Sequence, residues 1–189
     1  MAFPFETMSD DKFRGLVYKT MEHPEIAFIM KEMELMGCKV DRRFIQVEEC
    51  NENIGGGFRV PDGVVLCKNR LQGEDDLKNT IQHELIHAYD HCRCKRLNWQ
   101  DCEQQACSEI RAAALSGDCS WKMEWLRGKL NALGLLGNQQ HFQKCVKRRA
   151  QLSIGMKEAC HGYRSKEAVD KVFETCFKDT SPFPQGKYP

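Results

Sequence analysis

The sequence lacks any run of apolar residues near the ~20 that a helix needs to cross a bilayer. Its first ten residues have neither the apolar core of a secretory signal nor the arginine-rich pattern of a transit peptide. Internal repeats and low-complexity blocks are also absent. These absences predict a soluble protein without a cleavable targeting segment.

Strong net charge is missing as well, because 28 Lys and Arg residues nearly balance 27 Asp and Glu residues. The formal net charge of +1 gives no global field that would favour nucleic acid or an anionic membrane. A length of 189 residues suits one domain, or a core with a helical extension, and is sufficient to bury a hydrophobic core.

Cysteine is abundant, yet the paired Cys-x-x-Cys knuckles of structural zinc sites are absent. The 11 cysteines are distributed along the chain, which favours a disulfide framework formed in an oxidising compartment. The alternative is a set of buried free thiols that pack as small hydrophobes. An odd number leaves at least one thiol unpaired or bonded to another molecule. The cysteines are Cys38, Cys50, Cys67, Cys92, Cys94, Cys102, Cys107, Cys119, Cys145, Cys160 and Cys176.

The stretch 80–90 contains the pattern His83-Glu84-x-x-His87. Residues four apart lie on one face of an α-helix, so the two imidazoles can bind one metal ion together. Glu84 lies at the edge of that face, where it can accept a proton from water more readily than it can bind the metal. The pattern predicts a zinc peptidase with Glu84 as the catalytic base. A surface helix with two incidental histidines is the alternative interpretation.

Hydrophobic periodicity places this motif on a helix that follows a small sheet. Asn98 is the expected N-cap of the helix after the motif. Gly134 and Gly137 mark a break between two later helices. Cys50 and Cys67 each end a strand, so they are a plausible disulfide pair. The tail 181–189 is expected to be extended or disordered. The predicted helices are 10–21, 24–36, 75–92, 99–115, 121–130, 142–154 and 165–177, and the predicted strands are 44–50, 57–60 and 64–67.

A catalytic zinc site needs a third protein ligand and an open position for water. Glu109 is the first candidate, because it follows on the next helix among small residues that permit close packing. Asp90 is on the motif face and could bind the metal or orient a histidine. His91, or a residue later in the chain, is a further candidate for the third ligand. Arg111 is expected to form a structural ion pair rather than to polarise a substrate carbonyl.

Five segments together resemble one family. They are HELIHAYD at 83–90, ACSEIRA at 106–112, LSGDC at 115–119, CVKRRA at 145–150 and CFKDTSPF at 176–183. The family is the mitochondrial inner-membrane metalloprotease that matures an ATP-synthase subunit, whose animal members are also called Ku-binding proteins. The resemblance extends from about residue 13 to residue 183.

The resemblance implies a zinc-dependent endopeptidase of the mitochondrial intermembrane space, peripheral to the inner membrane, with Zn²⁺ as its cofactor. It implies that the substrate is the precursor of a membrane subunit of ATP synthase, and that the protein also assists assembly of that complex. Carried over, Glu84 is catalytic, His83 and His87 are metal ligands, and Glu109 gains support as the third. Cys94 is extra to the family's cysteine set and is the expected free thiol. No nucleic-acid partner is expected.

The expected fold is an α+β, zincin-like metallopeptidase in which a small antiparallel sheet packs on the motif helix, followed by a mostly helical, disulfide-bonded half. We expect a single domain over 1–189, with N-terminal helices and sheet at 9–70, zinc-site helices at 71–118, a helical part at 119–180 and a tail at 181–189. The rival functions are a protease-independent assembly chaperone and a Ku-binding nuclear partner in DNA repair. Near-neutral charge and the cysteine content disfavour the nuclear role.

Overall fold

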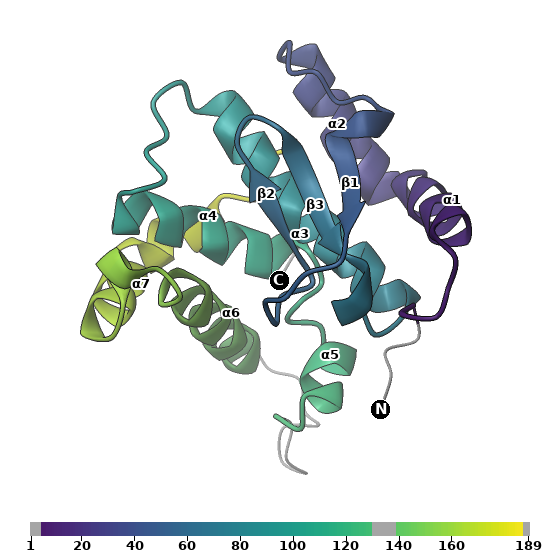
Figure 1. Cartoon of the computed structure of the whole chain (residues 1–189). Helices are drawn as coiled ribbons and strands as arrows, with labels where there is room; N and C mark the ends of the chain where they lie inside the picture. The colour runs from purple at the N-terminus through teal and green to yellow at the C-terminus, as the bar shows by residue number, and fades with distance from the viewer. Residues whose placement is uncertain (1–4, 130–138, 187–189) are drawn as a thin grey trace. The chain divides into compact units, whose positions relative to one another are not determined.

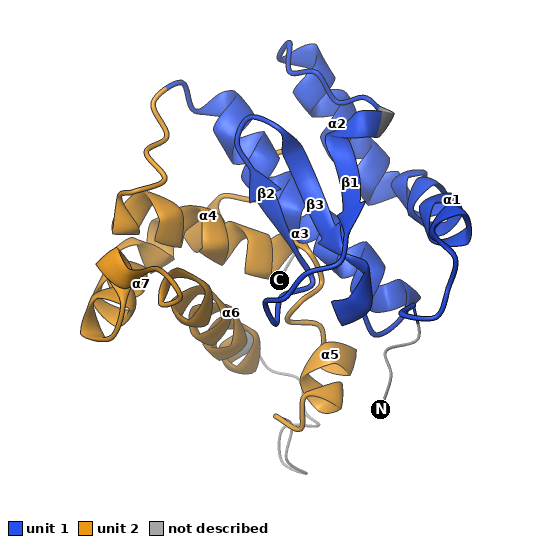
Figure 2. Cartoon of the chain, viewed as in Figure 1, with its two compact units in different colours: residues 1–95 blue, residues 96–189 orange. Residues whose placement is uncertain are grey.

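The computed structural model of the chain describes residues 5–129 and 139–186 (Figure 1). The chain divides into two compact units, residues 1–95 and residues 96–189 (Figure 2). This boundary falls within the expected zinc-site segment 71–118, and the single-domain expectation stays a prediction. In the described part of the chain, no helix is both long enough and apolar enough to cross a membrane.

Unit 1 contains three helices and a three-stranded sheet, which confirms the α+β class for this half. Pro24 occupies the first turn of its helix, as the sequence predicts, because a missing N–H costs nothing there. The elements are α1 (Asp10–Met21), α2 (Pro24–Leu35), β1 (Ile45–Glu48), β2 (Gly56–Arg59), β3 (Gly63–Cys67) and α3 (Glu74–Arg93), with short 3-10 turns at Arg42–Phe44 and Lys68–Arg70.

The sheet has the order β1-β3-β2, and its direction corrects the prediction. β2 and β3 form the expected antiparallel hairpin, but β1 pairs with β3 in parallel, with Val47 opposite Leu66. The chain reverses twice between β1 and β3, so these two strands point the same way. At the hairpin, Gly63 has φ +113°, and a Cβ there would clash with the carbonyl oxygen of Phe44. The turn therefore requires glycine.

Every residue of β3 is buried, as expected for the central strand of a covered sheet. α3 packs against β2, β3 and α2. Its apolar stripe of Leu77, Ile81 and Leu85 is fully buried. Burial of each such side chain contributes about 1.5–3 kcal/mol to folding, so this stripe fixes which face of α3 remains for other groups.

Unit 2 is helical, as predicted for the C-terminal half. α4 packs against α6 and α7. The N-cap of α4 is Asp101 rather than Asn98, because the Asp101 carboxylate accepts hydrogen bonds from the N–H groups of Glu103 and Gln104. The expected break at Gly134 and Gly137 lies outside the described residues. The elements are α4 (Cys102–Leu115), α5 (Trp121–Leu126), α6 (Gln139–Ile154), the 3-10 turn Glu158–Cys160 and α7 (Tyr163–Lys178).

Ten cysteines form five disulfides, which confirms the predicted framework and the bridge between Cys50 and Cys67. Cys94 is the free cysteine and is exposed, as the resemblance implies. Each disulfide closes within one unit. Unit 1 contains Cys38–Cys92 and Cys50–Cys67, and unit 2 contains Cys102–Cys160, Cys107–Cys176 and Cys119–Cys145.

The first part of the tail departs from the expectation of an extended or disordered segment. Residues 181–186 form turns, and Phe183 is buried. The fully buried Arg111 forms an ion pair of 2.7 Å with Asp179 and donates hydrogen bonds to the main-chain carbonyls of Asp179 and Ser181. Arg111 therefore has the structural role that the sequence favours, and it holds this segment in place.

Candidate metal centre

Helix α3 places His83 and His87 one turn apart on one face. Their ring centroids are 4.9 Å apart, and the rings meet edge to face at 76°. His83 is partly exposed, whereas His87 is buried. Two imidazoles in this arrangement can direct nitrogen atoms at one ion. The structure thus brings together the two histidines that the motif predicts.

The position of α3 is fixed at both ends and along its buried side. Three carboxylates, those of Glu74, Asp75 and Asp76, occupy its first turn, where they interact favourably with the helix dipole. Near its other end, Cys92 is bonded to Cys38 just beyond α2. These restraints hold the histidine face in one orientation relative to the sheet.

Glu84 follows His83 on α3 and is only 8% exposed. Its place in the sequence, between the two histidines, puts it beside their face rather than on it. This is the position that a proton acceptor next to a metal site requires.

Asp90 and His91, the alternative third ligands, have other contacts within unit 1. Asp90 is buried, and its Oδ1 accepts a hydrogen bond of 3.0 Å from Nε of Arg93. The ring of His91 lies 5.8 Å from that of Phe58. The pairing with Arg93 engages the Asp90 carboxylate in a charge-assisted bond.

Glu109 lies on α4 and is also buried. Its Oε1 accepts a hydrogen bond of 2.6 Å from Oγ of Ser153 on α6. Burial lowers the pKa of Lys157, and the negative charge of Glu109 opposes that shift. Sequence reasoning missed Ser153 and Lys157, because no local pattern links Glu109 to a serine 44 residues later.

Among the residues that the structure describes, the group that could hold a metal ion comprises His83, His87 and Glu109. Two imidazole nitrogens and one carboxylate oxygen are a donor set that catalytic zinc sites use, with a fourth position left for water. The side chains therefore fit a zinc ion by their chemistry. Asp90 and His91 are not members of this group.

Comparison with known proteins agrees with this chemistry. A profile described as Peptidase M76 family matches residues 12–184. A Homo sapiens protein named mitochondrial inner membrane protease ATP23 homolog is 40% identical over 185 residues, which are 96% of this chain and 72% of that protein. The mitochondrial inner membrane protease atp23 of Schizosaccharomyces pombe is 36% identical over 163 residues, 86% of this chain and 85% of that protein.

A third relative, the mitochondrial inner membrane protease ATP23 of Coccidioides immitis, is 36% identical over 168 residues, 88% of this chain and 68% of that protein. No solved structure matches the chain. Family membership therefore comes from sequence similarity over most of the chain.

Proposed function

Because the chain belongs to the Peptidase M76 family, we propose that it is a zinc metalloendopeptidase. In this proposal His83, His87 and Glu109 bind the metal, and Glu84 is the catalytic base. The observation that carries it is the pair of imidazoles 4.9 Å apart on α3, with a buried carboxylate next to them in sequence. The packing of α3 on the sheet is also what a zincin-like peptidase would need.

Two observations support Glu109 as the third ligand. It is one of the three side chains that could hold a metal ion, and its carboxylate is buried. A buried carboxylate is costly unless it is hydrogen-bonded or paired with a cation. Ser153 supplies one such hydrogen bond, and a carboxylate has two oxygens that can accept more than one interaction, a bond to a metal ion included. Asp90 is the weaker candidate because Arg93 already neutralises its charge.

The mechanism assigns separate tasks to the residues of α3. A zinc ion held by these ligands would make water more acidic and would polarise the scissile carbonyl. Glu84 accepts the proton of the attacking water and then passes it to the departing amine. β2 lies against α3 and, among the residues that the structure describes, is an edge strand of the sheet. An extended peptide could therefore bind there by strand addition.

The substitution Glu84→Gln tests this proposal. We expect it to lower peptide hydrolysis on the order of 10²–10⁴-fold, because the amide cannot accept the proton. Bound zinc should stay at the wild-type stoichiometry. Glu74→Gln, an exposed position on the same helix, is the matched control and should keep full activity. Hydrolysis that survives Glu84→Gln would refute the assignment of the base.

We further propose that the protein acts in the mitochondrial intermembrane space, peripheral to the inner membrane. The names of its relatives support a mitochondrial membrane setting. The five disulfides support an oxidising compartment, because such bonds are rare in reduced cytosol. Immunoblotting of mitoplasts with and without protease would test this location.

The proposed substrate is the precursor of a membrane subunit of ATP synthase, from which the enzyme removes an N-terminal presequence. The five family-like segments of the sequence support this choice. A protease-independent role in assembly of the same complex accompanies it. Cells that lack the protein and receive the Glu84→Gln variant would separate the two roles. If these cells assemble ATP synthase with the precursor still unprocessed, the result supports both the peptidase role and the separate assembly role. If the complex fails to assemble, the result counts against the assembly role.

A further inference from the structure

Helix α5 exposes two tryptophans and a leucine on one side. Trp121 is 45% exposed, Trp125 is 61% exposed and Leu126 is 60% exposed. Trp121 and Trp125 are four residues apart, so they lie on the same face of the helix. Large apolar side chains this accessible are costly in water unless they bind something.

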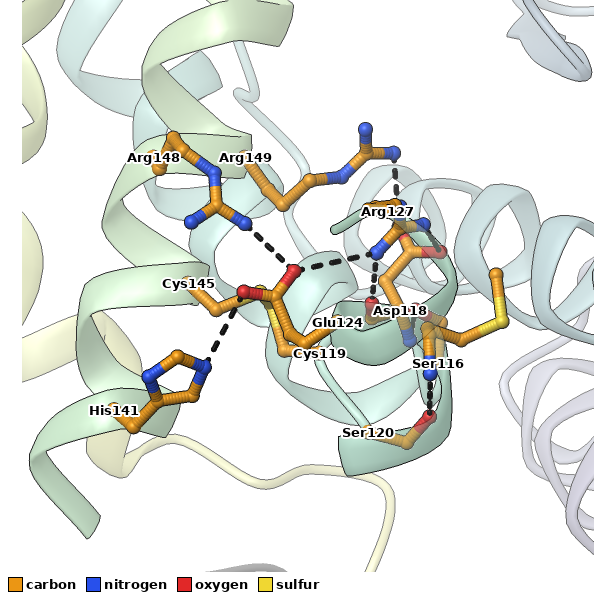
Figure 3. The surroundings of a disulfide bond; sticks show 11 residues. Ser116, Asp118, Cys119, Ser120, Glu124, Arg127, His141, Cys145, Arg148 and Arg149 are labelled. Atoms are coloured by element: carbon orange, nitrogen blue, oxygen red, sulfur yellow. Dashed lines mark hydrogen bonds and ion pairs between the residues drawn. A yellow bond between two sulfur atoms is a disulfide. The ribbon is translucent and has the colours of Figure 1, made fainter. Parts of the chain in front are cut away.

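The opposite side of α5 is buried and firmly held. Glu124 is fully buried, and its Oε1 accepts a hydrogen bond of 2.6 Å from Arg148 of α6. His141 and Arg127 lie 3.5 and 3.8 Å from the same carboxylate, and Figure 3 shows these side chains converging on Glu124. The inward side of the helix is thus fixed to α6 by charge-assisted contacts.

A disulfide reinforces this attachment. Cys119, two residues before α5 begins, is bonded to Cys145 of α6 (Figure 3). The side chain of Ser120 caps the helix by accepting a hydrogen bond from the N–H of Met123. The exposed tryptophans are therefore presented on a rigid support, and their exposure does not result from a loose segment.

The tryptophan face also carries positive charge. Lys122 is exposed and lies between the two tryptophans in sequence, and Lys129 is exposed three residues after the end of α5. Residues 118–154 contain seven basic residues and two acidic ones, although the whole chain has a net charge of only +1. Both acidic residues, Asp118 and Glu124, are buried and paired with arginines. Lys147 is paired with Asp170 of α7, so the positive charge beside the tryptophans comes from the exposed Lys122 and Lys129.

We propose that this tryptophan face, which consists of Trp121, Lys122, Trp125, Leu126 and Lys129, docks on the surface of a bilayer that contains anionic lipid. Tryptophan is the side chain that gathers at the boundary between lipid headgroups and acyl chains. Flanking lysines interact favourably with anionic headgroups, and each strengthens binding about fivefold. The combination matches a helix that lies in the interface rather than one that spans it.

A second copy of the chain fits this face less well. Three apolar side chains fall far short of the roughly 1,200–2,000 Å² of a stable protein interface. A two-fold pairing would also bring the lysines of both copies together, and like charges repel. The inference rests on the membrane association within the proposed function, but it uses none of the peptidase chemistry.

Co-sedimentation of the full-length protein with vesicles tests the proposal. We expect binding to phosphatidylcholine vesicles that contain phosphatidylglycerol, and weak binding to phosphatidylcholine alone. The pair Trp121→Ala and Trp125→Ala should lower the partition coefficient about tenfold or more. Lys122→Gln and Lys129→Gln should each lower it about fivefold, and only for the anionic vesicles.

Leu152 and Met156 provide a matched control, because they are exposed to 60% and 68%. Leu152 lies in the last turn of α6 and Met156 two residues after it, away from the tryptophans in sequence. Their replacement by alanine should leave the partition coefficient unchanged. An equal loss in this control, or no loss in the tryptophan variant, would overturn the proposal. So would a change in sedimentation coefficient of the tryptophan variant without vesicles, which would identify a second copy as the occupant.

Tryptophan quenching by brominated lipids gives a second, independent readout, and substitution by phenylalanine keeps an aromatic ring at each position. Brominated lipids quench tryptophans at the depth of the bromine atoms, and the double variant Trp121→Phe and Trp125→Phe leaves only Trp99 as background. Quenching that disappears in this variant supports docking, and quenching that persists contradicts it. The Glu84→Gln variant should bind vesicles as wild type does, so failure of the peptidase proposal would stay distinguishable from failure of this one.

Discussion

Ser153 donates a hydrogen bond of 2.6 Å from its Oγ to Oε1 of Glu109. The bond joins α6 to α4 across 44 residues of sequence. It fixes the orientation of a buried carboxylate that we propose as a metal ligand. Loss of a group that orients a metal ligand in this way commonly lowers metal affinity or activity 10–100-fold.

The first prediction concerns this hydrogen bond. Ser153→Ala should lower zinc affinity about 10–100-fold, because the Glu109 carboxylate loses its orientation. Competition with a chromophoric zinc chelator measures the change. Ser153→Thr, which keeps the hydroxyl, should restore most of the affinity. Ser165→Ala removes another buried serine hydroxyl of the same unit and should have no effect on zinc. An equal loss in both alanine variants would contradict a specific role for Ser153.

The second prediction separates the two candidate carboxylates. Glu109→Gln should abolish stoichiometric zinc binding, because it removes the anionic ligand. Asp90→Asn should keep the zinc and instead weaken the contact with Arg93. Metal analysis of both purified variants gives the answer. Zinc lost from Asp90→Asn and retained by Glu109→Gln would assign the third ligand to Asp90.

The third prediction concerns the dependence of stability on pH. Lys68 is buried and donates a hydrogen bond of 2.7 Å to Asp10, and this bond holds the pKa of Asp10 below its ordinary value. A carboxyl with a lowered folded-state pKa stabilises the fold above its unfolded-state pKa of ~4, and the contribution is lost as the pH falls through the folded-state value.

Asp10→Asn should therefore lower the free energy of unfolding at pH 7 and have a smaller effect at pH 3. Urea unfolding at both values measures the difference. Asp11→Asn changes the exposed neighbour in the same helical turn and should have little effect at either pH. An Asp10→Asn effect that is equal at the two pH values would show that charge is not its source.

The fourth prediction compares two disulfides of unit 2. Cys107–Cys176 closes 69 residues, whereas Cys119–Cys145 closes 26. Loop-closure entropy gives about 4 kcal/mol for the longer loop and about 3.5 kcal/mol for the shorter. Replacing the first pair by serine should therefore destabilise unit 2 more, as measured by urea unfolding. A thiol count of one, from Cys94, confirms that the other bridges have formed in each variant. A greater loss from the shorter loop would contradict the entropic account.

Local signals in the sequence predict the motif helix closely. The predicted span 75–92 lies within the observed Glu74–Arg93, because acidic residues and apolar periodicity define this helix without help from elsewhere. The pairing of Cys50 with Cys67 was also within reach, since each cysteine ends a short strand. The free thiol of Cys94 followed from the family resemblance.

Contacts between distant residues were beyond sequence reasoning. The parallel pairing of β1 with β3 depends on how two reversals are arranged in space, and neither strand encodes it. Phe183 lies in a segment rich in proline that appears unstructured by composition, yet its burial and the contacts of Arg111 order that segment. The hydrogen bond between Ser153 and Glu109 is of the same kind.

The confinement of each disulfide to one unit has a consequence for biogenesis. A chain that enters an oxidising space with its N-terminus first exposes Cys38, Cys50, Cys67 and Cys92 before any residue of unit 2. Both bridges of unit 1 can then close during translocation, without waiting for a thiol that has still to arrive. In such a chain, unit 1 is oxidised and can no longer move back through the membrane while unit 2 is still being translocated.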